Sequence, residues 1–183
     1  DGISKIVLPE GLFKLSRAAF NYCSNLKSVS ILSSPFIIED YVFECCTSLQ
    51  EVTLAEGLTE IPDFMFNECS SLASIIIPRG INNIGRYAFA DCNSLKTIAF
   101  MGGPMDIDST SFWNDIATVY YPNNGSWWEE DRQNYGGNLT WVARDSRSIF
   151  IDVSDSSQYY FEPVLWAVDN GITSGTSATT FSP

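Results

Sequence analysis

The chain has 183 residues, 45% of them hydrophobic and 17% charged, and a formal net charge of −12 at pH 7. The ten Lys and Arg residues are scattered, whereas a nucleic-acid surface needs them clustered against phosphates. The same charge disfavours docking on anionic lipid, and no apolar run approaches the length of a transmembrane helix. The length suits one elongated domain with an appendage.

A phenylalanine, followed three positions later by a cysteine, returns every 23 residues. The pairs are Phe20/Cys23, Phe43/Cys46, Phe66/Cys69 and Phe89/Cys92, and Phe112 keeps the phase with Asp115 at the cysteine place. Leucine returns in the same phase at Leu26, Leu49, Leu72 and Leu95. A fixed period in this range is typical of a solenoid, in which each rung buries its core only against its neighbours.

Each rung is predicted to begin with a short strand, such as residues 72–77. Pro78 ends that strand because it has no N–H to donate, and Gly80 is expected to let the backbone turn. A helical or 3₁₀ turn from Arg86 then directs Phe89 into the core. A terminal rung has fewer neighbours, so Phe112 is expected to contribute less than the central phenylalanines.

The stretch Ile81-Asn-Asn-Ile-Gly-Arg-Tyr-Ala-Phe-Ala-Asp-Cys-Asn-Ser-Leu95 resembles the BspA-type leucine-rich repeat, whose signature is I-x-x-I-G-x-x-A-F-x-x-C-x-x-L. The resemblance covers about residues 3–143, with a local departure at Asp40-Tyr41. It implies a leucine-rich-repeat solenoid of about five rungs, each a β-strand plus a short helical turn. It also implies a bacterial surface or secreted protein, often an adhesin-like one.

The five cysteines are interpreted as a structural ladder. Four occupy the same place in successive rungs, and Cys45 lies beside one of them. There is no C-x-x-C and no histidine, so the usual zinc patterns fail. A disulfide between rungs and a metal site remain as alternatives. No cofactor is predicted.

The absence of histidine removes Ser-His-Asp and Cys-His nucleophile systems. The acidic groups Glu39/Asp40 and Glu129 to Asp131 are adjacent in sequence, which indicates solvated surfaces rather than a glycosidase pair. Asp106 and Asp108 lack the spacing of a calcium loop. We therefore predict no catalytic residue, no metal site and no enzyme.

The outward positions of the predicted strands form a small, mostly polar face. They are Ser28, Ser30, Glu51, Thr53, Ser74, Ile76, Thr97 and Ala99. Solenoid faces are common binding surfaces, so these residues are the candidate binding face. The alternative is an ordinary solvated sheet.

Residues 113–143 are predicted to form an α/β cap that ends domain 1–143. Its strands are expected at Ala117 to Tyr121 and Leu139 to Ala143, separated by a helix that begins with the capping box Ser126-Trp-Trp-Glu129 and runs to about Tyr135. The cap is expected to cover the open end of the core with an aromatic cluster. Its members are Trp127, Trp128, Tyr135 and Trp141. A sugar-binding platform is the alternative reading of that cluster.

Composition changes at residues 144–148, which are predicted to be a linker. In residues 149–183 the string F-x-D-V, followed by W-A-V-D-N-G-I-T-S-G, resembles the S-layer homology repeat. That resemblance implies non-covalent attachment to cell-wall polysaccharide, usually through three such repeats. Only the first part of one is present, with a short helix predicted from Pro163 to Asn170. The tail is interpreted as the stub of a longer anchor.

These patterns predict a non-catalytic, adhesin-like bacterial protein that is extracellular and associated with the cell wall. The repeats would bind an unknown protein or glycan or act as a spacer, without nucleic acid and without membrane insertion. The complete anchor of the full-length protein would bind cell-wall polysaccharide. The alternatives are an accessory, non-catalytic region of a larger wall-anchored carbohydrate-active enzyme and a purely structural stalk.

Overall fold

The computed structural model describes residues 2–9, 11–32, 37–103, 105–122, 128 and 133–144. Residues up to Ala143 belong to one compact unit. The predicted linker and tail, residues 144–148 and 149–183, lie outside the described residues except for Arg144, as do Ser126 and Glu129 of the predicted capping box.

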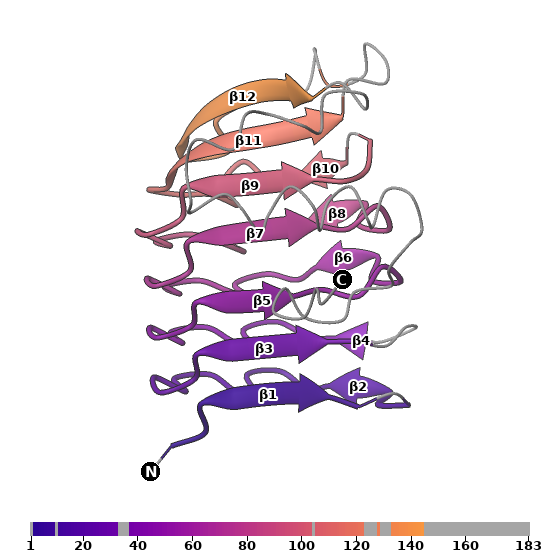
Figure 1. The fold of residues 1–183 in the computed structure, drawn as a ribbon, viewed down its shortest axis with the longest axis vertical. Coiled ribbons are helices and arrows are strands. Elements are labelled where there is room, and N and C mark those ends of the chain that lie inside the picture. Colours follow the sequence, from indigo (N-terminus) through magenta and orange to yellow (C-terminus); the bar gives the residue numbers. More distant parts are fainter. Residues whose placement is uncertain are drawn as a thin grey trace, which may run out of the picture. The chain divides into compact units, whose positions relative to one another are not determined.

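One strand of each rung stacks on the strand of the next to form the long face of the solenoid (Figure 1). These strands are β1 (Lys5–Leu8), β3 (Ser28–Ile31), β5 (Glu51–Thr53), β7 (Ser74–Ile77), β9 (Thr97–Phe100), β11 (Ile116–Pro122) and β12 (Asn138–Arg144). They form two sheets, in the orders β1-β3-β5 and β7-β9-β11-β12. The predicted parallel solenoid is therefore confirmed.

The register of these strands follows the sequence repeat. Val29 lies opposite Val52, and Ile75 opposite Ile98. At β11 the register shortens by two residues, since Val119 lies opposite Ile98. Because side chains alternate between the faces of a strand, a shift of two keeps the inward residues inward.

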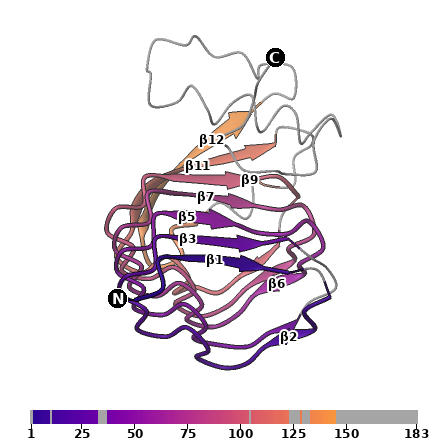
Figure 2. The same ribbon diagram turned by 60° about the horizontal axis from the view of Figure 1, so that its bottom comes forward.

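A second set of short strands runs along the opposite side of the rungs (Figure 2). It comprises β2 (Lys14–Leu15), β4 (Ile37–Ile38), β6 (Glu60–Ile61), β8 (Asn83–Ile84) and β10 (Asp106–Ile107). Among the described strands β2 pairs with β4, and β8 pairs with both β6 and β10. This return side is thus divided between β4 and β6.

The segment that carries each phenylalanine alternates between two kinds of hydrogen bond. In the first rung the Ala19 amide donates three residues back to Ser16, as in a 3₁₀ turn. The Ala18 and Phe20 amides instead donate to carbonyls of the next rung, at 3.0 and 2.9 Å. This alternation requires left-handed backbone at non-glycine residues, which recurs in the rungs at Ala18/Tyr22, Tyr41/Cys45, Phe64/Glu68, Tyr87/Asp91 and Asn114.

The phenylalanine ladder forms the centre of the core. Phe43, Phe66, Phe89 and Phe112 are fully buried, and neighbouring rings stack with centroids 5.3 to 5.7 Å apart. Phe112 is as buried as the central rings, because the cap segment lies over it and the Tyr135 carbonyl accepts its amide proton. The ring at the other end, Phe20, is only partly buried. The less protected end of the ladder is therefore the N-terminal one.

The cysteines form a ladder of free thiols. The Sγ atoms of Cys46, Cys69 and Cys92 each donate to the phenylalanine carbonyl of the preceding rung, all at 3.2 Å. Burial raises the pKa of these three thiols, that of Cys46 to about 12. Cys23, in the first rung, is only partly buried.

Asp115 replaces the thiol in the last rung. It is 1% exposed, and neither carboxylate oxygen has a hydrogen-bond partner among the described residues. The nearby Cys92 amide is directed to the Phe89 carbonyl. Burial raises the pKa of Asp115 to about 8, and the Asp91 carboxylate adds to that rise.

The C-terminal end is closed by β11, β12 and an aromatic cluster. Trp128 is buried and lies 5.0 Å from the Phe100 ring and 5.6 Å from the Trp141 ring, between centroids. Trp128 and Tyr135 are buried at the core end and Trp141 packs against it, whereas Trp127 and most of the predicted helix, residues 126–135, lie outside the described residues. Both strands expected in this segment are present, each extended by one residue at either end.

Gly80 is needed for a different reason from the predicted turn. Its backbone is not in the left-handed region, where the described glycines are Gly11 and Gly136. A Cβ at position 80 would instead lie 2.5 Å from the Glu56 carbonyl oxygen and 2.7 Å from that of Leu58. Glycine at this position lets two rungs approach closely.

Candidate functional site

The predicted binding face lies on the outer side of the long sheets. Glu51 and Thr53 are exposed, whereas most of the other predicted residues are partly buried by their neighbours in the sheet: Ser28, Ser30, Ser74, Ile76 and Thr97. Ala99 is only 2% exposed, and in register it lies between the larger side chains of Ile76 and Tyr120. The most accessible part of the face is thus at β5.

The same face continues beyond the predicted residues. On β1, Lys5 and Val7 are in register with Ser28 and Ser30 and are exposed. On β11, Thr118 and Tyr120 extend the two columns. Their places in the 23-residue repeat, counted with the shortened register at β11, are the feature of the sequence that could have identified these residues.

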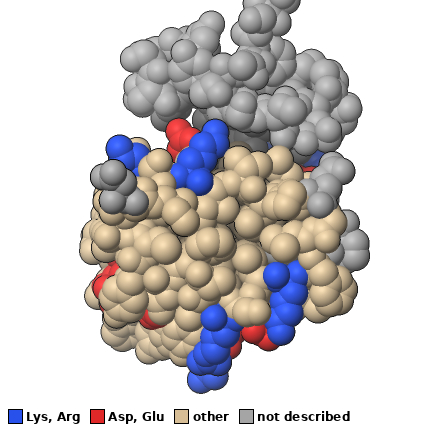
Figure 3. Space-filling view, turned by 90° about the horizontal axis from the view of Figure 1, so that it is seen from below, with Lys and Arg blue, Asp and Glu red and all other residues tan. Residues whose placement is uncertain are grey.

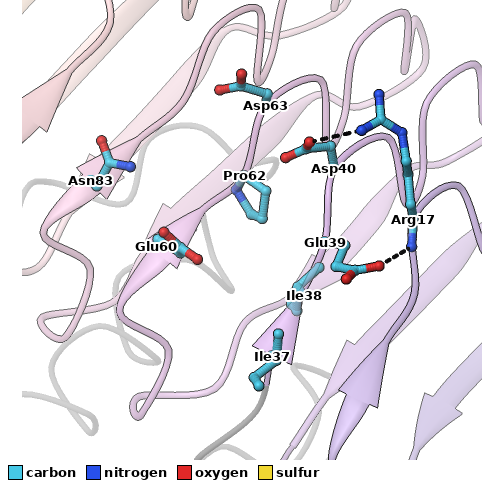
Figure 4. A pocket seen from close by; sticks show the side chains of 9 residues that line it. All are labelled: Arg17, Ile37, Ile38, Glu39, Asp40, Glu60, Pro62, Asp63 and Asn83. Atoms are coloured by element: carbon cyan, nitrogen blue, oxygen red, sulfur yellow. Dashed lines mark hydrogen bonds and ion pairs between the residues drawn. The ribbon is translucent and has the colours of Figure 1, made fainter.

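A groove of about 460 Å³ opens on the return side (Figure 4). It is lined by Arg17, Ile37, Ile38, Glu39, Asp40, Glu60, Pro62, Asp63 and Asn83. This groove was not predicted from the sequence. A detectable signal was a column of charged residues 23 positions apart: Arg17, Asp40, Asp63 and Arg86.

Pro62 explains why the groove lies between β4 and β6. At the matching place in other rungs, the Glu39 amide donates to Leu15 at 3.0 Å and the Gly85 amide donates to Ile61 at 2.8 Å. Proline has no N–H, so the corresponding bond from β6 to β4 cannot form. The ladder is interrupted there, and polar side chains occupy the opening.

Most charges of the groove are already neutralised by partners in a neighbouring rung. Lys14 contacts Glu39 at 2.5 Å, Arg17 contacts Asp40 at 3.4 Å, and Arg86 contacts Asp63 at 3.5 Å. The hydrogen bond from Lys14 is the main reason that the pKa of Glu39 is lowered. Within the described residues, no ion pair engages Glu60.

A second column of rings lies beside the charged column. Tyr41 stacks on Phe64 with centroids 4.6 Å apart, Phe64 stacks on Tyr87 at 5.2 Å, and the Arg17 guanidinium lies 4.5 Å from the centre of the Tyr41 ring. Because the faces of Tyr41, Phe64 and Tyr87 cover one another, they offer mainly edges to a ligand. Ring stacking between rungs is therefore a sufficient structural role for this column of aromatic residues.

The described residues contain no cluster of three or more His, Cys, Asp or Glu side chains that could hold a metal ion. In the same part of the chain, no helix is long and apolar enough to cross a membrane. Three of the four groove carboxylates, those of Glu39, Asp40 and Asp63, form ion pairs. The two surfaces described above are therefore candidates for binding.

Two family descriptions match the sequence. The BspA type leucine rich repeat region matches residues 2–118 in six copies, and the S-layer homology domain matches residues 150–183. No curated protein matches the chain.

Solved structures share the fold. A leucine rich repeat protein of T. pallidum is 31% identical over 64% of this chain and 58% of its own, with a TM-score of 0.58. A leucine rich cell surface protein of Faecalibacterium prausnitzii is 25% identical over 96% of this chain and 36% of its own, with a TM-score of 0.53. The pneumococcal vaccine antigen PcpA, 15% identical with a TM-score of 0.57, shows the fold alone. The chain thus spans less than two thirds of each of these proteins.

Proposed function

The chain belongs to the BspA-type leucine-rich repeat family, and we propose that it acts as a non-catalytic, adhesin-like protein that binds a protein or glycan through its long sheet face. The combination of leucine-rich repeats with an S-layer homology match is that of a surface-associated protein of the binding type.

One observation favours the long sheet face over the groove as the binding surface. In a chain with a net charge of −12, Lys5 and Glu51 are the charged residues among the outward side chains of β1, β3, β5, β7 and β9. The remaining outward residues are small, polar or aliphatic, and the parallel register fixes their spacing. Such a surface costs little to desolvate, because few charges must leave water.

The groove is the weaker candidate. Three of its four carboxylates already form an ion pair with a Lys or Arg side chain. A cationic ligand would therefore have to displace that side chain. Replacing one exposed ion pair by another gains little free energy. The long sheet face has no such pairs to break.

We propose that residues 149–183 contribute to attachment at the cell wall. The S-layer homology match at residues 150–183 supports this, since such domains typically bind cell-wall polysaccharide. The F. prausnitzii structure is that of a leucine rich cell surface protein, which agrees with an extracellular, wall-associated location for this chain.

The test uses two variants of the third rung that introduce the same side chain on opposite sides. Thr53→Arg places a long cation on the sheet face, and Glu60→Arg places one in the groove; both positions are exposed. The full chain is applied to a glycan array and to immobilised fibronectin, collagen and laminin. Circular dichroism melts verify that both variants fold.

We expect Thr53→Arg to weaken binding at least about tenfold for any probe that the unaltered chain binds. The reason is that the introduced cation would have to leave water at the centre of the face. Glu60→Arg should bind as before. Loss of binding in Glu60→Arg alone would assign function to the groove instead. Absence of binding to every probe would count against an adhesin-like role.

A further inference from the structure

The third rung is joined to its two neighbours by different strands. On the long face β5 pairs with β3 and not with β7, and on the return side β6 pairs with β8 and not with β4. Among the described strands these are the two interruptions of the ladders. We call them together the seam: the boundary between β5 and β7 on the long face and between β4 and β6 on the return side. The seam therefore passes diagonally across one rung.

A proline accounts for each interruption. Pro62 withholds the N–H that β6 would donate to β4. Pro78 holds the equivalent place on the long face, since one rung later the Met101 amide donates to the Ile77 carbonyl at 2.9 Å. Pro78 has no N–H with which to reach Leu54 in the same way. The sequence thus excludes one bond on each side of the third rung.

Packing and pairing are also weaker along the long side of the seam. Val52 occupies an inward place on β5, yet it is only partly buried. Its counterparts on other long strands are at most 1% exposed: Val29, Ile75 and Ile98. Before the strand, the Lys96 amide donates to the Ala73 carbonyl at 2.9 Å, whereas the Ala73 amide makes no such bond to Gln50. The contact between β5 and β7 is therefore looser than that between β7 and β9.

The ion pairs of the return side do not cross the seam. Two pairs join the first rung to the second: Lys14–Glu39 and Arg17–Asp40. Viewed from the N-terminal end, basic side chains accordingly lie beside acidic ones at the margin of the molecule (Figure 3). Arg86 and Asp63 join the fourth rung to the third. Within the described part of the chain, no ion pair joins the second rung to the third.

The segment that carries the phenylalanines continues through the third rung without a break. Three amides of the second rung donate to the third at 2.8 to 3.0 Å, namely those of Tyr41, Phe43 and Cys45. Three amides of the third rung donate to the fourth at 2.8 Å, namely those of Phe64, Phe66 and Glu68. The Phe66 ring also stacks on the rings of both neighbouring rungs. This segment holds the three rungs together while the other two sides are unpaired.

We propose that the third rung is a hinge, at which the two N-terminal rungs bend against the rungs from β7 onward about the phenylalanine segment. Bending widens the gap between β5 and β7 or between β4 and β6, and it breaks no hydrogen bond between paired strands. The same bend between β7 and β9 would break such bonds. The inference concerns the backbone alone and is independent of the proposed ligand binding.

Residual dipolar couplings test the hinge on the full chain, aligned in dilute filamentous phage. The couplings of the β1 and β3 amides are fitted to one alignment tensor, and those of the β7, β9 and β11 amides are fitted to another. In a rigid solenoid the two tensors are equal, whereas motion at a hinge averages one of them more than the other. We expect their magnitudes to differ by at least about 1.2-fold.

Restoring the missing donors should remove this difference. Pro62→Ala combined with Pro78→Ala supplies an N–H on each side of the third rung, so the two magnitudes should become equal. Pro9→Ala is the matched control, since Pro9 holds the place of Pro78 in the first rung and faces no earlier strand among the described residues. It should leave the difference unchanged.

Equal tensors in the unaltered chain would overturn the proposal without any variant. A difference that persists in the folded double variant, or that Pro9→Ala also removes, would overturn it as well. Circular dichroism melts establish that the variants fold.

Discussion

At the scale of single residues, the cysteine place of each rung requires a hydrogen-bond donor. A thiol meets this need in Cys46, Cys69 and Cys92, where each Sγ–H reaches a carbonyl one rung back. Asp115 can donate there only while its carboxyl is protonated. The side chain at this place therefore makes the last rung sensitive to pH.

We predict that Asp115→Asn stabilises the protein, and that the gain grows with pH. The folded-state pKa of Asp115 is raised from 3.8 to about 8. The stability that the neutral carboxyl contributes is fully present below about pH 4 and is lost as pH rises through about 8. The variant supplies a permanent N–H donor and should gain about 1–3 kcal/mol at pH 8.

Urea unfolding of both proteins at pH 4.5 and pH 8, compared at each pH, measures this difference. Asp106→Asn is a suitable control, since it removes an exposed carboxylate of a neighbouring strand, β10. An Asp115→Asn gain that is the same at both pH values would mean that the Asp115 carboxyl is not buried as described.

At the scale of elements, rungs are held together by close approach as well as by hydrogen bonds. Gly80 shows this most clearly, because a methyl group there would meet two carbonyl oxygens of the preceding rung at 2.5 and 2.7 Å. Backbone atoms cannot move aside as a flexible side chain can. The connections that follow β5 and β7 would have to separate locally.

Gly80→Ala should therefore destabilise the protein by about 1–3 kcal/mol, the usual cost of overpacking. Asn82→Ala is the matched control in the same connection, since the Asn82 side chain is exposed. Thermal melts of the two variants make the comparison. If both variants melt like the unaltered chain, the rungs are not as closely packed at Gly80 as the structure shows.

The repeat made most elements predictable from sequence alone. Period, strand positions and the buried ladder all follow from residues such as Phe66 and Cys69 returning in phase, because stacked rungs demand equivalent residues. The reason for Gly80 was not predictable, since close approach depends on the carbonyls of Glu56 and Leu58 in another rung. A turn and a close approach both select glycine.

The groove was not predicted from the sequence because it, too, depends on contacts between rungs. The effect of Pro62 depends on its place beside β4 one rung away, to which it cannot donate an N–H. The accessible extent of the sheet face was also hidden, since the burial of Ala99 depends on the shortened register that brings Tyr120 beside it. Contacts across rungs decide both features.

At the scale of the whole molecule, the two ends of the solenoid differ. The C-terminal end is covered by β11, β12 and Trp128, whereas at the N-terminal end Ile3 is exposed and Phe20 is only partly buried. In a stacked array each rung is stabilised mainly by its two neighbours, so a rung with one neighbour opens first. The most rigid part of the candidate binding face is then expected around β7 and β9.

Hydrogen exchange of the full chain, followed strand by strand, tests this account most directly. Protection should be greatest in β7 and β9 and should fall toward β1, with exchange at β1 faster by at least about tenfold, because local opening there breaks fewer contacts. Uniform protection from β1 to β11, or a β1 as protected as β7, would contradict a solenoid that is closed at its C-terminal end and open at its N-terminal end.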